Sequence, residues 1–506
     1  MKVLLEMRPA FDGHAGIPQA TRLLFRGLQQ LPGVEVEGLI QSSNRVLAPG
    51  LQAGARQLPE HQRVDRLSRV VVSLQATANI SLRERVLAGL RLAWQPSIQL
   101  LGTLLGRRVS LGHFDPTHFK DFVWRAMFAR TLRLEDFEGV TAARFRVARV
   151  PWSAAHAGAL AARWLGRALY PRLDTRGYDV MLAETPYPGR VSAGTTLVVR
   201  YHDAIPLLMP HTISDRAHHQ AIHYHALKRN VADGAWFACV SDATRRDLVS
   251  IFPEAAARAV TLHNMVSLHY HAEESQAERV PEIIRTRLSH SITNNRPDAA
   301  QLKSGSPVDY LLMVSTIEPR KNHLTLLAAW EQLQVEQLPA LKLVLVGSLG
   351  WDHKAIVKRL RPWMARGDLY ILEEVPAAEL RLLYRHARAT VCPSYGEGFD
   401  FSGVEAMRCG GVVAASDIPV HREVFGAAAE YFSPYSAGLM AGAVQRVIAP
   451  GADARRAELM AAGAEVSARY LPERILPQWK AFLGRLGPIH ESDVAYRSPE
   501  ASEARS

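Results

Sequence analysis

The sequence predicts an α/β protein with two doubly wound domains, each built on a parallel sheet with helices on both faces. The chain has 506 residues, which exceeds the usual size of a single hydrophobic core and favours two large domains. Its 48% hydrophobic and 22% charged residues are typical of globular proteins. Short apolar runs alternate with helix-like segments, as strands buried on both faces of a parallel sheet require.

Apolar runs in each half predict the strands of the two sheets. In the first half they are residues 3–7, 34–40, 178–183, 196–201 and 236–240. In the second half they are residues 310–315, 341–347, 369–374, 389–393 and 412–416. A helix-like segment follows each strand of the second half, which is typical of parallel strands joined by crossover helices.

Composition divides the chain into five parts. Residues 1–270 form the predicted first domain, 271–307 a polar linker or insertion rich in turn residues, and 308–472 the second domain. Residues 473–486 form a predicted helix that caps one domain or crosses between the two. Residues 487–506 contain few apolar side chains and are predicted to be disordered.

Cysteine usage and the N-terminus indicate a reducing, cytoplasmic setting. Cys239, Cys392 and Cys409 are the only cysteines, and they are too few and too scattered for a disulfide framework or a zinc site. The first residues lack the long apolar region of a signal peptide, and no run of eighteen apolar residues predicts a transmembrane helix.

The basic charge of the chain does not select a partner by itself. Lys and Arg number 60 against 49 Asp and Glu, which gives a formal net charge of +11. Such a surface attracts nucleic acid, anionic lipid or phosphorylated substrates. Nucleic-acid binding is not expected, because the arginines and histidines are dispersed rather than clustered on one helix.

Residues 83–112 mix leucine and isoleucine with several arginines around Trp94. A basic amphipathic surface of this kind is typical of proteins that lie on an anionic membrane. The favoured interpretation is a helical lid that packs on its own domain with solvated arginines, because the polar face is short. Peripheral contact with the inner face of a membrane is kept as the alternative.

A first group of polar residues follows the strand predicted over residues 310–315. Open α/β sheets bind ligands in the loops at the carboxyl ends of their strands. Arg320 and Lys321 lie in such a loop and suit a diphosphate, the guanidinium through paired hydrogen bonds and the ammonium as a point charge. Two solvated loop cations would be the ordinary interpretation if this pair stood alone.

A second group lies in a glycine-rich loop that leads into a predicted helix. Glu397 and Glu405 stand eight positions apart, beside a helix start that favours phosphate. Ser402 and Glu405 also fit a capping box, in which Ser402 caps the helix and Glu405 bonds back to its N–H. That structural role is the simpler local interpretation for Glu405, whereas Glu397 has no comparable one.

Taken in order, these motifs resemble the retaining glycosyltransferases of family 4, which have the two-domain, Rossmann-like GT-B fold. The resemblance is strong over residues 309–448 and weaker upstream. The motifs that carry it are Arg320-Lys321-Asn322, the glycine turn at residues 346–351, Glu397-Gly398-Phe399, Glu405-Ala406-Met407 and residues 416–423.

The resemblance implies roles for the residues of the second domain. Arg320 and Lys321 would hold the donor diphosphate, Glu397 the hydroxyls of the donor sugar, and Glu405 the ribose. Gly403 and Val404, at the start of the helix, would bind the donor through the backbone. No metal or cofactor is implied, since the nucleotide sugar is a substrate and the chain contains no Asp-x-Asp triplet.

Two positions in the first domain, which would carry the acceptor, match the family less closely. His202 ends a predicted strand where the family places a catalytically useful histidine, although a structural histidine is the ordinary alternative there. Asp203 is expected to orient His202 or a nearby backbone group. Gly16 lies in a loop that looks like the family's glycine loop, where the backbone approaches phosphate or acceptor.

The chain departs from the family pattern after Glu397. Many members have Gly-Phe-Gly-x-Pro there, whereas this chain has Gly398-Phe399-Asp400-Phe401-Ser402. Asp400 adds a carboxylate next to the expected sugar pocket. We therefore assign Asp400 to the donor site and expect it to influence which sugar is bound.

The resulting hypothesis is a retaining glycosyltransferase. It would transfer a hexose of the mannose type from a nucleoside-diphosphate sugar to a glycan or lipid-linked glycan, in O-antigen or capsule synthesis. Two alternatives remain open: a sugar-nucleotide hydrolase or epimerase of the same fold, and a non-catalytic subunit of a polysaccharide assembly complex.

Overall fold

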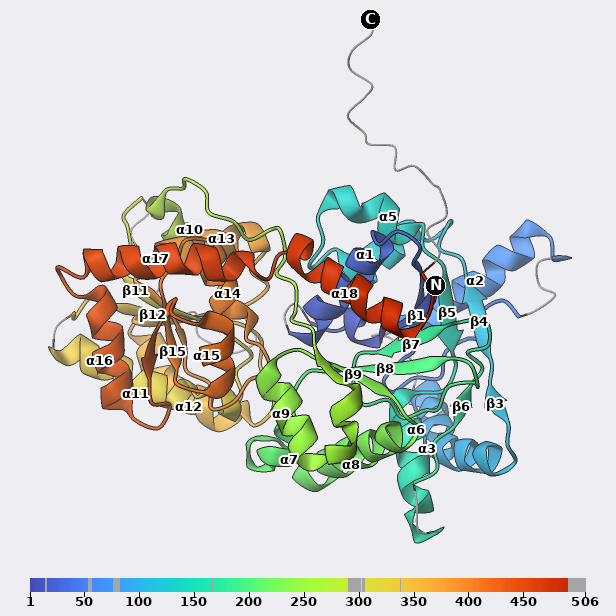
Figure 1. Cartoon of the computed structure of the whole chain (residues 1–506). Helices are drawn as coiled ribbons and strands as arrows, with labels where there is room; N and C mark the ends of the chain where they lie inside the picture. The colour runs from blue at the N-terminus through green and yellow to red at the C-terminus, as the bar shows by residue number, and fades with distance from the viewer. Residues whose placement is uncertain are drawn as a thin grey trace, which may run out of the picture.

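The computed structural model describes residues 1–13, 16–52, 57–75, 82–165, 168–289, 302, 305–336 and 338–489. Within these ranges the side chains of residues 82–92, 164 and 165 are not described. The described chain forms two halves that lie side by side, with the N-terminal half on the right and the C-terminal half on the left of Figure 1. The predicted disordered tail lies outside the described residues from residue 490 onward.

The N-terminal half is built on one large sheet. All neighbouring strands run parallel except β4 and β5, which pair antiparallel. In sheet order the strands are β10 (Ala259–Thr261), β9 (Trp236–Cys239), β8 (Thr196–Tyr201), β7 (Val180–Ala183), β1 (Lys2–Glu6), β2 (Glu35–Ile40), β5 (Phe145–Ala148) and β4 (Leu111–Phe114). A small separate sheet pairs β3 (Arg108–Val109) with β6 (Arg172–Leu173).

Helices cover this sheet on both faces, so its central strands are buried on each side. They are α1 (Ile17–Gln29), α2 (Glu60–Leu74), α3 (Leu82–Leu104), α4 (Lys120–Val123), α5 (Phe137–Thr141), α6 (Trp152–Ala161), α7 (Ile205–Leu208), α8 (Arg216–Ala232) and α9 (Asp242–Ile251). The strand β7 is buried at every position, which explains why it is uniformly apolar.

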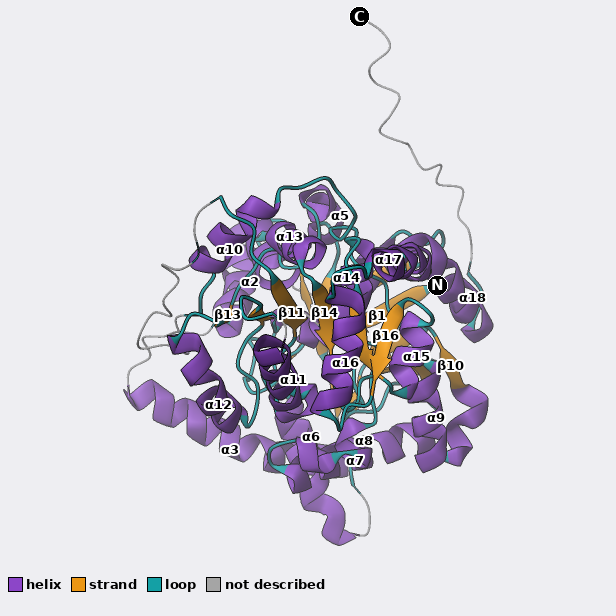
Figure 2. Ribbon diagram, turned by 90° about the vertical axis from the view of Figure 1, so that its left-hand side faces the viewer, coloured by secondary structure: helices purple, strands orange, loops and turns teal. Residues whose placement is uncertain are grey.

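The C-terminal half contains a second sheet, all of whose neighbouring strands are parallel. The strands, in sheet order, are β13 (Leu369–Leu372), β12 (Lys342–Val346), β11 (Tyr310–Val314), β14 (Ala389–Cys392), β15 (Val413–Ser416) and β16 (Ala429–Phe432). The helices are α10 (Val280–Thr286), α11 (His323–Glu336), α12 (His353–Ala365), α13 (Ala377–His386), α14 (Phe401–Arg408), α15 (Pro419–Phe425), α16 (Ala437–Ile448), α17 (Asp453–Ala468) and α18 (Pro472–Leu486). Figure 2 looks onto this half, with helices in front of and around its strands.

Each sheet has one point at which the strand order reverses. In the N-terminal sheet β1 lies between β2 and β7, and in the C-terminal sheet β11 lies between β12 and β14. The loops on the two sides of such a point diverge and leave room for a ligand at the carboxyl ends of the strands. The sites of interest should therefore lie after β1 and β7 in one half and after β11 and β14 in the other.

The last helix returns to the first half. α18 crosses from the C-terminal to the N-terminal half (Figure 1), and its Ile475, Trp479, Phe482 and Leu483 join the N-terminal core. Buried Arg200 lies over the Trp479 ring at 5.2 Å and donates hydrogen bonds to Leu262 O and Asn264 Oδ1. Arg200 thus holds together the segment at Leu262 and Asn264, where the chain leaves the N-terminal half, and α18, where it returns.

The fold class predicted from the sequence is confirmed, and the predicted strands are present with small shifts at their ends. The strands that the sequence did not predict are β3 and β6 of the small separate sheet and, in the two large sheets, β4, β5, β10 and β16. Three of these, β4, β10 and β16, are edge strands, and each is partly exposed, so they lack a continuous apolar run. The predicted domain boundaries themselves stay predictions.

One part of the predicted polar linker is more ordered than its composition indicated. Residues 280–286 form α10, whose Val280, Ile283 and Ile284 are buried in the core of the C-terminal half. The polar residues around this helix obscured its short apolar stripe. Residues 290–301 of the linker lie outside the described residues.

α3 occupies most of the stretch for which a lid or a membrane contact was expected. One side packs on α6, where the carbonyl of Pro96 approaches Gly158 so closely that a Cβ there would lie 2.8 Å from Pro96 O. Among the described residues, no helix combines the length and apolar character needed to cross a membrane. The packing agrees with the lid interpretation, and it leaves the opposite face of α3 exposed.

Candidate active site

The loops after β11 and β14 bring the predicted diphosphate cations and Glu397 into direct contact. Arg320 Nη1 donates to Glu397 Oε2 at 2.7 Å, and Lys321 Nζ donates to Glu397 Oε1 at 2.5 Å. These side chains are largely buried, with 13%, 16% and 7% exposure for Arg320, Lys321 and Glu397 respectively. The sequence placed these three residues in one site, and the structure brings them together at the reversal point of the sheet.

The charges in this cluster hold Glu397 in its ionised form. Burial alone would raise the pKa of Glu397, but the positive charges of Arg320 and Lys321 outweigh it and lower the pKa below its usual value. Arg320 also donates to Glu318 Oε1 at 2.9 Å. Burial raises the pKa of Glu318, which the sequence analysis did not single out.

His202 lies next to this cluster, across the boundary between the halves. It follows β8, and its Nε2 lies 3.2 Å from Glu184 Oε2 at the end of β7. A Cβ on Gly398 would lie 1.8 Å from the carbonyl oxygen of His202, so only glycine allows the Glu397 loop to approach this closely. The two loops therefore meet backbone to backbone.

Glu184, which sequence reasoning missed, is the residue that contacts the His202 ring. The carboxylate of Asp203 instead accepts a hydrogen bond from Ile205 N–H at 3.0 Å, which is the backbone role allowed for it. Glu184 was hard to find, because a single acid after an apolar strand gives no motif. The available signal was its position directly after β7, because ligands bind at the carboxyl ends of parallel strands.

Glu405 is buried and hydrogen-bonded to both halves of the protein. Gln19 Nε2, in the first turn of α1, donates to Glu405 Oε1 at 2.8 Å, and the Tyr384 hydroxyl donates to Oε2 at 2.9 Å. Burial raises the pKa of Glu405 from 4.5 to about 7. Its contact with ribose stays a prediction.

The predicted capping box is wrong. The N-cap of α14 is Asp400, whose Oδ1 accepts from Ser402 N–H at 3.1 Å and from the Ser402 hydroxyl at 2.6 Å. The helix begins two residues earlier than the pattern indicated, because Asp400 adopts a left-handed backbone with φ 62° and caps it instead. Glu405 is thereby released from the capping role.

Asp400 has structural partners for both of its oxygens. Beside the two bonds from Ser402, His421 Nε2 lies 3.1 Å from Oδ2. Burial would raise the pKa of Asp400, but the bonds and charge of His421 lower it well below its usual value. Its influence on the donor sugar stays a prediction, and its contacts show that it also fixes the loop.

The remaining predicted donor residues lie at helix starts. A Cβ on Gly403 would lie 2.3 Å from the Phe425 ring, which explains the glycine by packing. The Val404 side chain is fully buried in the core, so a donor contact there would go through the backbone. Gly16 is the N-cap of α1 with φ 72°, three residues before Gln19, and its predicted role is not tested by these contacts.

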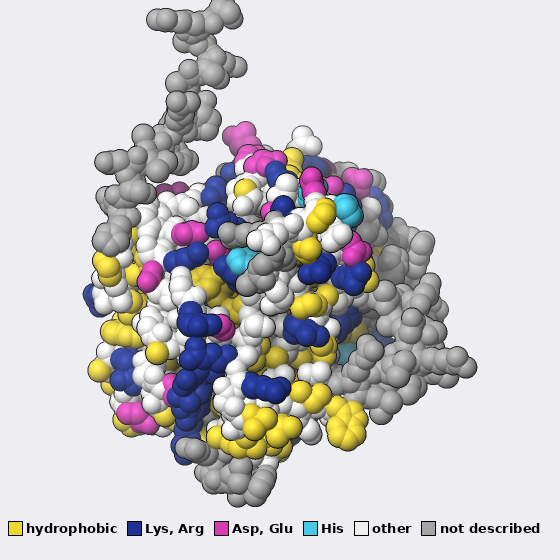
Figure 3. All heavy atoms as spheres, turned by 90° about the vertical axis from the view of Figure 1, so that its right-hand side faces the viewer, with side chains coloured by type: hydrophobic (Ala, Val, Ile, Leu, Met, Phe, Trp, Pro, Cys, Tyr) yellow, Lys and Arg dark blue, Asp and Glu magenta, His cyan; other side chains and the backbone are white. Residues whose placement is uncertain are grey.

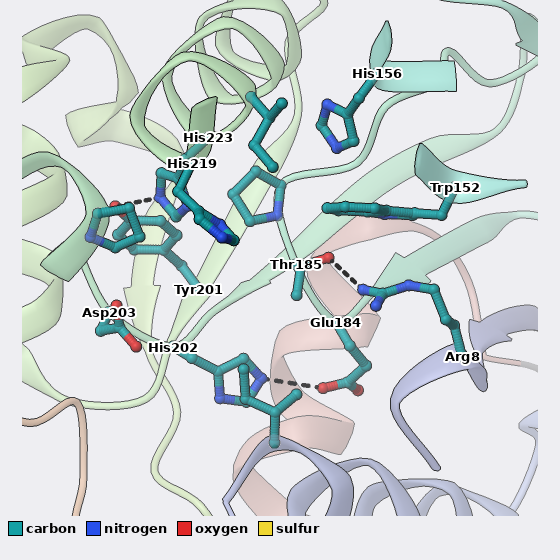
Figure 4. A pocket seen from close by; sticks show the side chains of 14 residues that line it. Arg8, Trp152, His156, Glu184, Thr185, Tyr201, His202, Asp203, His219 and His223 are labelled. Carbon is teal, nitrogen blue, oxygen red and sulfur yellow. Dashed lines mark hydrogen bonds and ion pairs between the residues drawn. The ribbon is translucent and has the colours of Figure 1, made fainter. Parts of the chain in front are cut away.

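A cavity of about 220 Å³ lies beside His202, within the N-terminal half. Figure 4 shows Arg8, Trp152, His156, Glu184 and His202 arranged around it. These residues come from the strand ends beside the reversal point of the first sheet and from α6. His202 thus lines the cavity and, through its backbone carbonyl, also lies against the loop that carries Glu397.

Within the described residues, no group of three His, Cys, Asp or Glu side chains is placed to hold a metal ion. The three cysteines are buried and unpaired with one another. That the reaction needs neither metal nor cofactor stays a prediction.

Comparison with known proteins supports the resemblance found in the motifs. Residues 295–463 match the family model described as glycosyl transferases group 1. O-antigen chain mannosyltransferase B of Escherichia coli is 32% identical over 187 residues, which are 37% of this chain and 44% of that protein. The serotype-specific mannosyltransferase WbdA of Escherichia coli is 35% identical over 157 residues, which are 30% of this chain and 19% of that protein. The matched part of the chain thus spans less than half the length of these relatives.

Solved structures extend the likeness to both halves. Sucrose-phosphate synthase from Thermosynechococcus elongatus aligns over 96% of this chain and 98% of its own, with 16% identity and a TM-score of 0.56. HepE of Anabaena in complex with UDP-glucose aligns over 96% of this chain and 100% of its own, with 15% identity and a TM-score of 0.53. At such low identity the likeness concerns the fold, which is GT-B.

The raised pKa of Glu405 predicts how stability depends on pH. Between pH 4.5 and about 7 the folded protein holds a proton on Glu405 that the unfolded chain releases. The stability linked to this proton is therefore complete below about pH 4.5 and is lost as the pH rises toward 7. Glu405→Gln, which stays neutral, should be more stable than the wild type at pH 8 by up to about 3 kcal/mol and should lose this advantage near pH 5.

Urea unfolding of both proteins at the two pH values measures the difference. Glu465→Gln is the control, because Glu465 is 80% exposed and should change stability little at either pH. An equal difference between Glu405→Gln and wild type at pH 5 and pH 8 would contradict the raised pKa.

Proposed function

We propose that the protein is a retaining glycosyltransferase that moves a hexose from a nucleoside-diphosphate sugar to a hydroxyl of a glycan or lipid-linked glycan. The observation that carries the proposal is the contact of Arg320 and Lys321 with Glu397, placed against His202 of the other half. Such a site offers cations for a diphosphate and an ionised carboxylate for sugar hydroxyls. Relatives named as O-antigen mannosyltransferases support mannose as the sugar and O-antigen or capsule synthesis as the setting.

The donor would bind mainly to the C-terminal half. Its diphosphate would draw Arg320 and Lys321 toward the phosphate oxygens, next to the first turn of α14 with Gly403 and Val404. The positive end of this helix adds to the attraction for a phosphate. Glu397, freed from part of its ion pairing, would accept hydrogen bonds from the sugar hydroxyls. Guanosine is our choice for the base.

The reaction would be a single displacement in which the acceptor attacks on the face from which the diphosphate leaves. The bond between the anomeric carbon and the phosphate oxygen breaks, and the acceptor oxygen forms the new bond on the same face. The acceptor proton passes to the departing phosphate oxygen, so no further base is required. Arg320 and Lys321 stabilise the negative charge of the diphosphate as it leaves. In this complex Glu397 binds the sugar hydroxyls and is not assigned to attack on the anomeric carbon, which favours this single displacement.

We further propose that α3 rests on an anionic membrane at the cytoplasmic face, where a lipid-linked acceptor would be presented. Trp94, Ile98, Leu101 and Leu105 are spaced by four, three and four residues and share one face. They are 65%, 54%, 59% and 62% exposed. The basic residues Arg107 and Arg108, which follow directly, are exposed too and complement anionic lipid. Figure 3 shows hydrophobic and basic side chains close together on this side of the molecule.

Lys321→Ala should abolish most binding of the donor. Removing a cation from a buried diphosphate site costs several kcal/mol, so affinity should fall at least about 100-fold. The measurement is the thermal stabilisation of the purified protein by a panel of nucleotide sugars that includes GDP-mannose and UDP-glucose. Lys354→Ala is the matched control, since Lys354 is an exposed lysine on α12.

The same panel, incubated with acceptor glycans, separates transfer from its alternatives. Free sugar or an epimer without transfer product would indicate the hydrolase or epimerase. Unchanged biological activity of Lys321→Ala and Glu397→Ala in cells would indicate a non-catalytic subunit. Either result would contradict the proposed function.

The double variant Trp94→Ser, Leu101→Ser should bind vesicles more weakly because it loses two exposed apolar anchors. We expect at least a tenfold loss of partitioning onto vesicles of phosphatidylglycerol and phosphatidylcholine, measured by co-sedimentation. Val335→Ser is the control, because Val335 is 83% exposed on the other half. Equal partitioning of both variants and wild type, or no binding by the wild type, would refute the membrane contact.

A further inference from the structure

The cavity beside His202 is lined by residues that carry unsatisfied buried polar atoms. Trp152 Nε1, both ring nitrogens of His156, and Glu184 Oε1 have no hydrogen-bond partner among the described residues. His156 is 2% exposed and Glu184 is fully buried. Each of these atoms is itself sealed from water, so a ligand in the cavity reaches them only after the side chains turn toward it. Because a buried polar atom without a partner costs about 1–3 kcal/mol, three such residues beside one cavity favour a ligand that completes them.

These atoms present a particular mixture of donors and acceptors. The Trp152 indole can only donate, and the free oxygen of Glu184, when ionised, can only accept. Burial lowers the pKa of His156 well below its usual value, so its ring is neutral and offers one donor and one acceptor. A sugar ring matches this mixture, because each of its hydroxyl groups both donates and accepts.

The charges around the cavity disfavour an anionic ligand. Arg8, the cation that lines it, already donates to Glu6 Oε1 at 2.8 Å and to the Thr185 hydroxyl at 2.9 Å. Burial lowers the pKa of His223 to about 4, which leaves its ring neutral as well. A phosphate or carboxylate placed here would meet the Glu184 carboxylate without a spare buried cation.

The tryptophan offers its edge rather than its face. Its ring lies 4.1 Å from the His156 ring, and the Arg8 guanidinium lies 4.5 Å from its centroid. Figure 4 shows His156 on one side of the indole and Arg8 on the other. A ligand is therefore held by hydrogen bonds to its hydroxyls rather than by stacking on the indole.

We infer that this cavity is the acceptor subsite and that it takes one uncharged sugar ring, recognised through its hydroxyls by Trp152, His156 and Glu184. The volume of about 220 Å³ is smaller than the pockets of drug-sized ligands, which suits a single monosaccharide unit. Glu184 bonds His202 through its other oxygen, so it connects the bound ring to the residue that faces the Glu397 loop. The inference rests on the proposed function and specifies the acceptor's chemistry.

Binding of simple methyl glycosides tests this subsite directly. The probes are methyl α-mannopyranoside, methyl α-glucopyranoside, methyl α-galactopyranoside and methyl N-acetyl-α-glucosaminide, with mannose 6-phosphate as the anionic comparison, all measured by saturation-transfer NMR. At least one neutral glycoside should bind the wild type. Trp152→Phe and His156→Phe should each weaken the binding of that glycoside about tenfold or more. Both variants keep an aromatic ring at the position but remove its hydrogen-bonding atoms. Glu184→Gln, nearly isosteric, should also weaken it and keeps the test informative if an aromatic variant unfolds.

Tyr170→Phe is the matched control. Among the described residues the Tyr170 hydroxyl also has no hydrogen-bond partner, but Tyr170 packs against His156 and does not line the cavity. Its removal should change glycoside affinity less than twofold. Thermal stabilisation by GDP and UDP should be the same in all these variants, because the nucleotide would bind the other half.

The outcomes separate this inference from the proposed function. Absence of binding by every neutral glycoside, tighter binding of mannose 6-phosphate, or unchanged affinity in the three cavity variants would overturn the subsite while nucleotide binding stands. Failure of the wild type to bind any nucleotide or nucleotide sugar would instead overturn the proposed function.

Discussion

The ion pairs of Glu397 with Arg320 and Lys321 are the interaction on which the site depends. A buried carboxylate is stable only when opposite charges and hydrogen bonds compensate its lost hydration. Both cations come from the loop after β11 and the carboxylate from the loop after β14, so the pairing joins the two sides of the sheet's reversal point. In the proposed function a diphosphate would compete for the same two cations, so the ion pairs with Glu397 would be broken when the donor binds.

The two halves are in contact through polar groups on both sides of this cluster. Gln19 of α1 donates to Glu405 of α14, and the Glu423 carboxylate accepts from the backbone N–H groups of Asp242 and Ala243 at 2.6 and 2.8 Å. Gly398 lies against the backbone of His202. The residues proposed for the donor and those proposed for the acceptor are therefore brought close to one another by the same contacts that hold the halves together.

Much of the fold could be predicted from the sequence, because strands buried on both faces must be apolar along their whole length. The edge strands β4, β10 and β16 lack that constraint and were missed, and α10 was hidden in a polar segment. In the site, ordered motifs identified Arg320, Lys321 and Glu397. The capping box failed because Asp400, with a left-handed backbone, competed for the same helix start. Glu184 and Gln19 act through contacts distant in sequence, which no local pattern encodes.

The proposed function requires Arg320 and Lys321 to exchange Glu397 for the diphosphate of a nucleotide. The most direct measurement is a crystal structure of the protein with GDP or the nucleoside diphosphate that stabilises it best. The diphosphate should lie within hydrogen-bond distance of Arg320 and Lys321, at the first turn of α14. A nucleotide bound elsewhere, with both ion pairs to Glu397 intact, would contradict it.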